Sequence, residues 1–151
     1  MKEIIQGRLE NIAFMQRTGM QVVEARRGYG KVVMPLAGNE NHIGAMYMGA
    51  LSTLAEAGAA TSVSTFVDFE RYFPVITRIE IDFLKPALSD VSAEYGLTEE
   101  QIDALNAELE QAGRCTYVAE LPLVDDRGQV SAQAKVTVKV LSHQGPIQSA
   151  D

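Results

Sequence analysis

Apolar residues recur at helical spacing near the N-terminus and again in the middle of the chain. Ile5, Leu9 and Ile12 predict an amphipathic helix that ends before Gly19 and packs on the edge of a sheet. The apolar stretch over about 49–66 is rich in Ala and Leu and is too long for one strand. We therefore expect a buried central helix there.

Most of the remaining chain alternates between apolar and polar residues, which is the pattern of half-buried strands. The alternation predicts a hairpin over 20–36 and strands over about 78–83, 91–97, 115–124 and 130–141. An antiparallel sheet whose concave face covers the central helix is the economical arrangement for these elements. The predicted fold class is therefore α+β.

A shorter helix is predicted between the strands over 91–97 and 115–124. Thr98 and Gln101 fit a capping box, and Gly113 suits a helix C-cap, so the helix should occupy 98–112. No repeat or linker divides the chain, and we expect a single domain over 1–151. The residues from His143 onward are expected to form a frayed tail.

Charge and composition limit the partners and the compartment. With 20 acidic and 13 basic residues, the net charge of −7 argues against a surface for nucleic acid or anionic membranes. The apolar stretch Ile43 to Val67 contains a Glu and three Gly, so it favours a buried helix over a membrane span. The N-terminus lacks the continuous apolar core of a secretory signal.

Metal and disulfide chemistry are not expected. The lone Cys115 cannot form an intrachain disulfide, which fits a reducing compartment and predicts a cytoplasmic protein. Two histidines and one cysteine are a poor supply of soft metal ligands. The sequence therefore predicts no metal and no cofactor.

Glu56 is the only charged side chain between His42 and Asp68, in the middle of the helix predicted to be most buried. Burial of an unpaired carboxylate costs several kcal/mol, so such a group takes up a proton more readily or finds a partner. A carboxylate with a raised pKa suits a general base, and a desolvated one can be a nucleophile. The alternative is that Glu56 lies on an exposed stripe of the helix.

The loop before the central helix offers further polar groups. The Asn41 amide can cap a turn or polarise a carbonyl group. Near Met48 and Gly49 the start of the helix presents free backbone N–H groups, which suit a developing oxyanion. Taken alone, His42 is interpreted as a loop residue and Tyr47 as a packing residue.

The segment NHIGAMYMGALSTLAE resembles the signature region of hotdog-fold thioesterases, especially the branch with the phenylacetate-degradation and 4-hydroxybenzoyl-CoA thioesterases. Tyr47 and Met48 replace the His and the first Gly of that signature. The later segment ITRIEIDFLKPA resembles the family strand that ends in a hydrophobic-basic-Pro-Ala step. The positions that match the signature are Asn41, Gly44, Gly49 and Glu56.

This resemblance implies a curved sheet around a central helix and a homodimer, or a dimer of dimers, with composite active sites. Glu56 of one subunit would face the partner's Asn41, and would activate water or attack the thioester. The backbone N–H of Met48 would bind the thioester oxygen, and Asn41 would position substrate or water. Tyr47 would stand in for the family His, and Thr77 would reach Glu56.

The resemblance also implies an acyl-CoA or acyl-carrier thioester as the substrate. Arg78 and Lys85 are the nearest cations along the strand, and Lys85 lies where family members meet the CoA phosphates. Met46, Met48 and Phe66 would line an apolar acyl pocket. The predicted substrate-binding residues are His42, Gly49, Met46, Phe66, Arg78 and Lys85.

Two other functions stay open at this point. His42 and Glu56 are fourteen residues apart, as are the loop His and helix Glu of fatty-acid dehydratases, although the Phe-Pro and Pro-Gly steps of that pattern are missing. Loss of the His-Gly pair also fits a non-catalytic acyl or CoA binder. Thiol release, water addition to an enoyl thioester, and binding without turnover distinguish the three functions.

Overall fold

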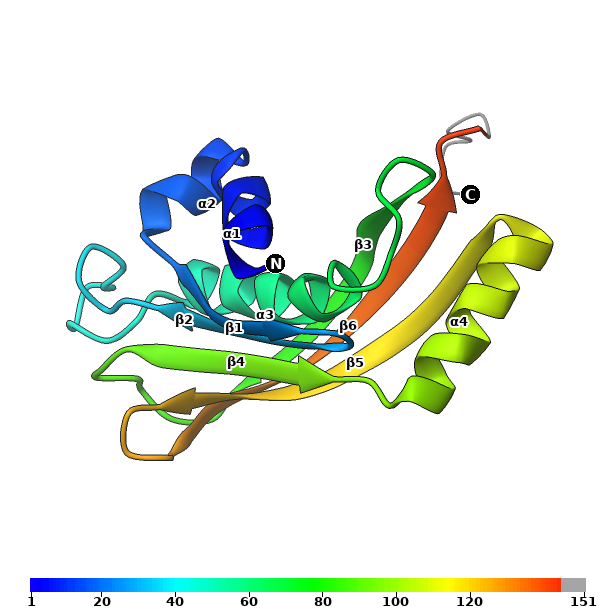
Figure 1. The fold of residues 1–151 in the computed structure, drawn as a ribbon. Helices are drawn as coiled ribbons and strands as arrows, with labels where there is room; N and C mark the ends of the chain where they lie inside the picture. Colours follow the sequence, from blue (N-terminus) through cyan, green and yellow to red (C-terminus); the bar gives the residue numbers. More distant parts are fainter. Residues whose placement is uncertain (145–151) are drawn as a thin grey trace.

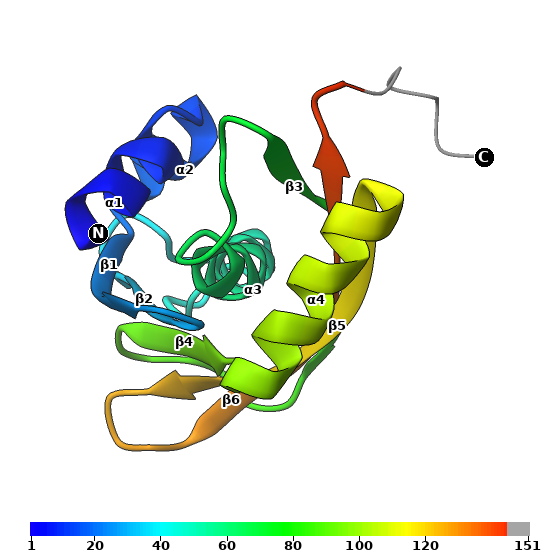
Figure 2. The ribbon, with the colours of Figure 1, turned by 45° about the vertical axis from the view of Figure 1, so that its right-hand side comes forward.

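The computed structural model of the protein describes residues 1–144. A single antiparallel sheet with the strand order β1-β2-β4-β5-β6-β3 curves around the helix α3 (Figures 1 and 2). The strands are β1 Gln21–Arg26, β2 Tyr29–Met34, β3 Tyr72–Phe83, β4 Val91–Gly96, β5 Arg114–Asp125 and β6 Val130–Ser142. The helices are α1 Lys2–Glu10, α2 Ala13–Thr18, α3 Met48–Val63 and α4 Glu99–Ala112.

Helix α3 lies in the core because it is apolar around most of its circumference. The small residue Gly58 lets the helix approach the sheet closely, since a Cβ atom there would lie 2.8 Å from the Cβ of Ala93 and 2.9 Å from Leu121. Most α3 side chains are buried, while Ser52, Glu56 and Ala60 are only half-buried. This is the hotdog arrangement expected from the sequence, which confirms the α+β fold class.

Strands β5 and β6 follow the predicted alternation. The inward side chains of β6, from Ala132 through Val136 to Val140, are almost completely buried, and polar side chains alternate with them. The observed bounds of β5 and β6 lie within one residue of the predicted ones. The alternation predicts these strands well because one face of each packs against the helix.

The N-terminal segment forms two helices, so the prediction of one helix ending before Gly19 is wrong. The backbone of Ile12 is extended, at φ −90° and ψ 104°, and separates α1 from α2. In one straight helix, Met15 would be rotated around the axis by about 80° from Ile5 and by about 120° from Leu9, because successive residues turn by about 100°. The break lets α1 bury Ile5 and Leu9 and α2 bury Met15, and it leaves the Ile12 side chain 48% exposed.

Helix α1 covers the edge strand β1, as predicted. The side chain of Gln6 accepts a hydrogen bond from the Val22 N–H at 2.6 Å and donates one to the Met20 carbonyl at 3.1 Å. These bonds satisfy backbone groups that an open sheet edge would leave unpaired. In Figure 1, α1 and α2 lie above α3, on the side away from β4 and β5.

Helix α4 is inserted between β4 and β5 and starts and ends as predicted. Thr98 and Gln101 form the capping box, and Gly113 is the left-handed C-cap with φ 69°. The Tyr72 hydroxyl donates to the Leu109 carbonyl of α4 at 3.3 Å. Because the chain leaves the sheet for this helix, β4 and β5 pair only over Val91–Ala93.

Strand β3 is longer than predicted and forms an edge of the sheet. It begins at Tyr72 rather than near 78, and within residues 1–144 it pairs only with β6. Its early part contains Pro74, which lacks an N–H donor and is tolerated in an edge strand. The register shifts between Ile76 and Arg78, so Thr77 is the extra residue of a bulge.

The end of α3 and the C-terminal segment differ from the predictions. Helix α3 ends at Val63, and residues 64–66 continue as hydrogen-bonded turns rather than as helix. His143 is not frayed, since its N–H donates to the Arg71 carbonyl at 3.0 Å and its ring lies 4.9 Å from that of Phe73. The rest of the predicted tail, 145–151, lies outside the described residues.

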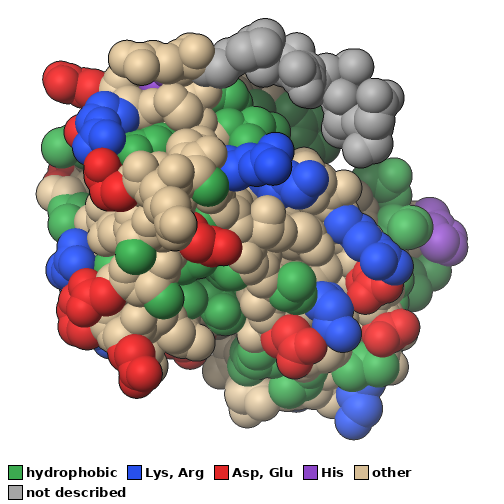
Figure 3. Space-filling model, turned by 90° about the vertical axis from the view of Figure 1, so that its right-hand side faces the viewer, with side chains coloured by type: hydrophobic (Ala, Val, Ile, Leu, Met, Phe, Trp, Pro, Cys, Tyr) green, Lys and Arg blue, Asp and Glu red, His purple; other side chains and the backbone are tan. Residues whose placement is uncertain are grey.

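The surface carries charges of both signs. On the face seen in Figure 3, acidic and basic side chains are interspersed among polar and apolar ones. Arg71 and Glu110 form an ion pair at 2.7 Å that links the segment before β3 to α4. None of the helices among residues 1–144 combines the length and apolar character needed to cross a bilayer.

Candidate active site

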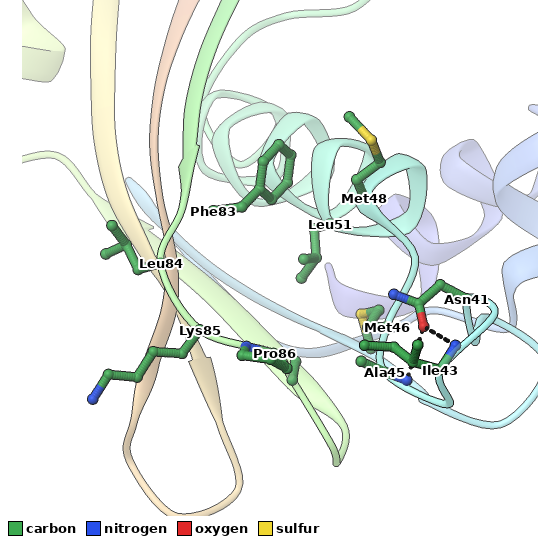
Figure 4. A pocket seen from close by; sticks show the side chains of 11 residues that line it. Asn41, Ile43, Ala45, Met46, Met48, Leu51, Phe83, Leu84, Lys85 and Pro86 are labelled. Carbon is green, nitrogen blue, oxygen red and sulfur yellow. Dashed lines mark hydrogen bonds between the residues drawn. The ribbon is translucent and has the colours of Figure 1, made fainter.

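Two cavities contain most of the predicted site residues, and they lie at opposite ends of β3. The Asn41 cavity, of about 280 Å³, lies between the loop before α3 and the segment 83–87 (Figure 4). The Glu56 cavity, of about 650 Å³, lies between α3, the first half of β3 and the N-terminal helices. The Glu56 cavity is lined by Arg8, Leu9, Ile12, Met15, Glu56, Ala60, Ser64, Phe69 and residues 73–79.

Glu56 is the acidic group of the larger cavity. It projects from the stripe of α3 that its own sheet leaves uncovered, and it is half-buried. Within residues 1–144 it has no hydrogen-bond or ion-pair partner, and burial raises the pKa of its carboxyl group through desolvation. A carboxylate that is desolvated but still reachable is suited to accept a proton or to attack an electrophile.

Asn41 lines the smaller cavity and also holds its own loop together. Its side-chain oxygen accepts hydrogen bonds from the N–H groups of Ile43 at 3.0 Å and Ala45 at 3.1 Å (Figure 4). Its backbone N–H donates to the Ala45 carbonyl at 2.6 Å. The turn role is therefore established by geometry, and the side-chain NH₂ group stays available to a ligand.

The start of α3 has free donors next to the Asn41 cavity. Tyr47 is the N-cap residue and makes no side-chain capping hydrogen bond, so the N–H groups of Met48 and Gly49 keep no intrahelical partner. The Tyr47 ring lies over Gly49, where a Cβ atom would be 2.4 Å from the ring. Met48 lines the cavity and its side chain is 55% exposed.

The cations near the two cavities differ in their surroundings. Arg78 lines the Glu56 cavity, is exposed, and forms an ion pair with Glu80. Lys85 lines the Asn41 cavity, where its backbone N–H donates to the Ser131 carbonyl at 3.1 Å. In Figure 4 the Lys85 side chain extends away from Asn41.

Other predicted residues divide into those that line a cavity and those that do not. Thr77 lines the same cavity as Glu56, and Met46 lines the Asn41 cavity from a buried position. Phe66 packs against the hydrophobic core and lines neither cavity. His42 is exposed and also lines neither cavity.

The sequence interpretation missed the wall of the Glu56 cavity that α1, α2 and Phe69 form. Arg8 lies over the Phe69 ring, with 3.4 Å from the guanidinium carbon to the ring centroid. Ala60 and Ser64 were also missed, although their spacing of four and eight residues from Glu56 places them on one stripe of a helix. That spacing is the sequence signal that would have identified them.

Many solved structures resemble this chain, and three of them illustrate the similarity. A protein of unknown function from Pseudomonas aeruginosa, described as a probable thioesterase, is 38% identical, with 93% of this chain and 95% of that chain covered and a TM-score of 0.85. A thioesterase from Haemophilus influenzae is 15% identical, with 98% and 95% covered and a TM-score of 0.75. A mutant thioesterase from Pseudomonas aeruginosa is 20% identical, with 94% of each chain covered and a TM-score of 0.74.

The last two structures share the fold with this chain at low identity. No curated protein matches the sequence. The family described as Domain of unknown function (DUF4442) matches residues 6–140, which is most of the chain. The chain therefore belongs to the DUF4442 family, and its fold is the hotdog fold.

Proposed function

We propose that the protein hydrolyses acyl thioesters, with Glu56 as the general base or the nucleophile. The observation that carries the proposal is the half-buried, unpaired Glu56 carboxylate in the wall of a large, mainly apolar cavity. An apolar pocket with one desolvated carboxylate suits a thioester that has an acyl chain and a reactive carbonyl group. The relative described as a probable thioesterase supports the same reaction class.

The reaction has two routes from this residue. As a base, the Glu56 carboxylate removes a proton from water while the water oxygen adds to the thioester carbonyl carbon. The C–S bond then breaks, and the thiolate takes up the proton to leave as the free thiol. As a nucleophile, the carboxylate oxygen attacks the carbonyl carbon, and the C–S bond breaks to release the thiolate. Water then hydrolyses the mixed anhydride, which restores the Glu56 carboxylate and gives the free acid, and the proton that this acid loses on ionising converts the thiolate to the thiol.

The two cavities come together if two copies pair along the unpaired edge of β3. Residues 73–79 line the Glu56 cavity, and 83–87 line the Asn41 cavity. Antiparallel pairing of β3 with its symmetry copy places the first half of one strand beside the second half of the other. A two-fold dimer therefore brings Glu56 of each subunit toward the partner's Asn41 and forms two equivalent composite sites.

In this composite site the remaining groups take complementary roles. The Met48 N–H at the start of α3 binds the oxygen that gains charge in the transition state, with the helix dipole adding to its effect. The Asn41 NH₂ group positions substrate or water. Thr77 positions Glu56 or its water, and the Tyr47 hydroxyl takes the place of the family His.

The leaving group is proposed to lie at the polar mouth of the site. Lys85 lines the Asn41 cavity and Arg78 lines the Glu56 cavity, and both are exposed, so they suit the phosphates of CoA or of an acyl carrier. The similarity of the segment 41–56 to the phenylacetate-degradation and 4-hydroxybenzoyl-CoA thioesterases is the reason to test CoA thioesters first. A cytoplasmic location agrees with such substrates and is proposed together with them.

The experiment is thiol release from a panel of acyl-CoA substrates by the wild type and by Glu56→Gln. We expect the Gln variant, which keeps the shape and loses the proton acceptor, to lose at least about 10²-fold in kcat. Glu108→Gln changes an exposed glutamate on α4 in the same way and should keep full activity. A folded Glu56→Gln protein with wild-type turnover would remove Glu56 from the mechanism, and a wild type that binds acyl-CoA without releasing thiol would show a binding protein.

A further inference from the structure

One wall of the Glu56 cavity is formed by a row of residues along α3. Glu56, Ala60 and Ser64 follow one another at intervals of four residues, so they lie on one stripe of the helix. The apolar residues Leu9 and Met15 form one side of the cavity, and the first half of β3 forms the other. The cavity is therefore a groove that leads away from Glu56 toward the end of α3.

Two residues from distant parts of the chain lie at the far end of the groove. The Arg8 guanidinium carbon lies 3.4 Å from the centroid of the Phe69 ring, and both residues line the groove beside Ser64. None of the ion pairs among residues 1–144 involves Arg8, so the aromatic ring is the group that holds it. Both side chains are half-buried.

A third cavity lies next to the Arg8–Phe69 pair. The N-terminal cavity, of about 360 Å³, is lined by Met1, Ile4, Ile5, Arg8, Ser64, Val67 and Phe69. Arg8, Ser64 and Phe69 belong to both cavities. The stacked Arg8 and Phe69 side chains therefore form a partition between the groove and a further apolar space.

The length of the groove can be compared with that of an acyl chain. Eight residues of α-helix, from Glu56 to Ser64, span about 12 Å at 1.5 Å per residue. An extended chain advances about 1.2 Å per bond, because the three backbone bonds of one residue span at most about 3.6 Å. The groove thus matches a straight chain of about ten carbons.

From these observations we infer that the groove holds a straight medium-chain acyl group, and that the Arg8–Phe69 pair sets its maximum length. The inference rests on the proposed function, since it takes the thioester carbonyl to lie beside Glu56. The acyl chain runs over Ala60, and its methyl end stops at the partition. A small aryl group would leave the far half of the groove unfilled.

The test is kcat/KM for straight-chain acyl-CoA substrates from butyryl-CoA to palmitoyl-CoA, with phenylacetyl-CoA and 4-hydroxybenzoyl-CoA for comparison. For the wild type we expect a rise of about fourfold for each added CH₂ group, corresponding to about 0.8 kcal/mol, up to decanoyl-CoA and then a fall. A flat profile, or a preference for either aryl-CoA, would overturn the inference and leave the proposed function intact.

Two variants move the end of the groove in opposite directions. Ala60→Leu fills its middle and should lower kcat/KM for decanoyl-CoA by about tenfold or more while butyryl-CoA is spared. Its matched control is Ala107→Leu on the exposed face of α4. Phe69→Ala removes the partition and should shift the optimum toward palmitoyl-CoA. Its matched control is Phe14→Ala, since Arg17 lies over Phe14 outside both cavities.

Different results would contradict the acyl groove and the proposed thioesterase function. If neither Ala60→Leu nor Phe69→Ala changes the chain-length profile relative to its control, the groove does not hold the acyl chain. If no thioester is hydrolysed, the proposed function fails, and calorimetric binding of decanoyl-CoA still tests the groove. Weaker binding by Ala60→Leu than by Ala107→Leu would support it, and equal binding would overturn it.

Discussion

Gly30 on β2 lies directly against Thr61 on α3. A Cβ atom at Gly30 would be 2.3 Å from the Thr61 Cγ2 atom and 3.2 Å from the Ser62 backbone nitrogen. Thr61 is completely buried, so its side chain has no free space into which to move. The helix that carries Glu56 is therefore positioned against the sheet by the absence of a side chain at one strand residue.

We predict that Gly30→Ala lowers the free energy of unfolding by about 1–3 kcal/mol, the usual cost of overpacking a core. Gly7→Ala is the control, because a Cβ atom at Gly7 in α1 meets nothing within 4 Å and alanine favours the helix by about 1 kcal/mol. Urea denaturation of both variants measures the difference. Adding Thr61→Ser, which removes Cγ2, should recover part of the loss. Equal stability of Gly30→Ala and Gly7→Ala would contradict the close packing.

The protonation of Glu56 should be visible in the stability of the protein. Burial raises the pKa of Glu56 above its value in the unfolded chain, so the folded state binds this proton more tightly. Ionisation therefore costs stability as the pH rises through the folded pKa, and the cost is absent below the unfolded pKa of about 4. Glu56→Gln should have a higher thermal midpoint than the wild type at neutral pH, and the gap should close toward acidic pH.

Thermal unfolding across this pH range measures the gap. Glu108→Gln, on the exposed face of α4, is the matched control for loss of one negative charge. A gap that is independent of pH, or that is the same for both variants, would show that Glu56 is not destabilised by its surroundings in the native protein.

Met48 allows a direct test of the backbone donor. It is the first residue of α3, where proline fits, and Tyr47 before it has ψ 140°, the conformation that precedes proline. Met48→Pro should thus keep the helix but remove the N–H, and we expect kcat to fall by about 10²–10³-fold. Met48→Gly should retain most activity because it keeps the donor. Circular dichroism confirms folding, and equal turnover of the two variants would exclude the Met48 N–H as the oxyanion donor.

The edge of β3 predicts the assembly state. Sedimentation or light scattering should give a mass of at least twice 16.4 kDa for the wild type. Val75→Lys places a charge on the edge strand, where Val75 is 36% exposed, and should yield monomers that lack thioesterase activity. Val118→Lys on β5, at 47% exposure, is the control and should remain dimeric. An active wild-type monomer would refute the composite site.

Periodicity predicted those parts of the fold in which one face of an element is buried along its whole length. The alternation over 130–141 and the apolar stretch near 49–66 correspond to β6 and α3, because core packing imposes a constant period on both. The break at Ile12 was not predicted, because the residues on each side of it have helical spacing. The break can be recognised only from the position of the core, which α1 and α2 both face. The bulge at Thr77 depends on how β3 pairs with β6, which alternation along one strand does not report.

The sequence singled out Glu56 as a candidate residue, but it did not indicate the residues that form the walls of the Glu56 cavity. The charge-free surroundings of Glu56 in the sequence left open whether its side chain is buried or exposed, and in the structure it is half-buried on the uncovered stripe of an otherwise buried helix. Arg8 and Phe69 meet only through the tertiary packing of α1 against the segment before β3. No local pattern joins two residues so far apart along the chain, so the length of the groove becomes visible only in the structure.

The short pairing between β4 and β5 divides the sheet into two parts. β1, β2 and β4 form one leaf, β5, β6 and β3 form the other, and backbone hydrogen bonds join the leaves only near Val91–Ala93. Rotation of one leaf against the other about this strip breaks far fewer hydrogen bonds than bending either leaf across its long ladders. Bending of the sheet at this strip would change its curvature around α3.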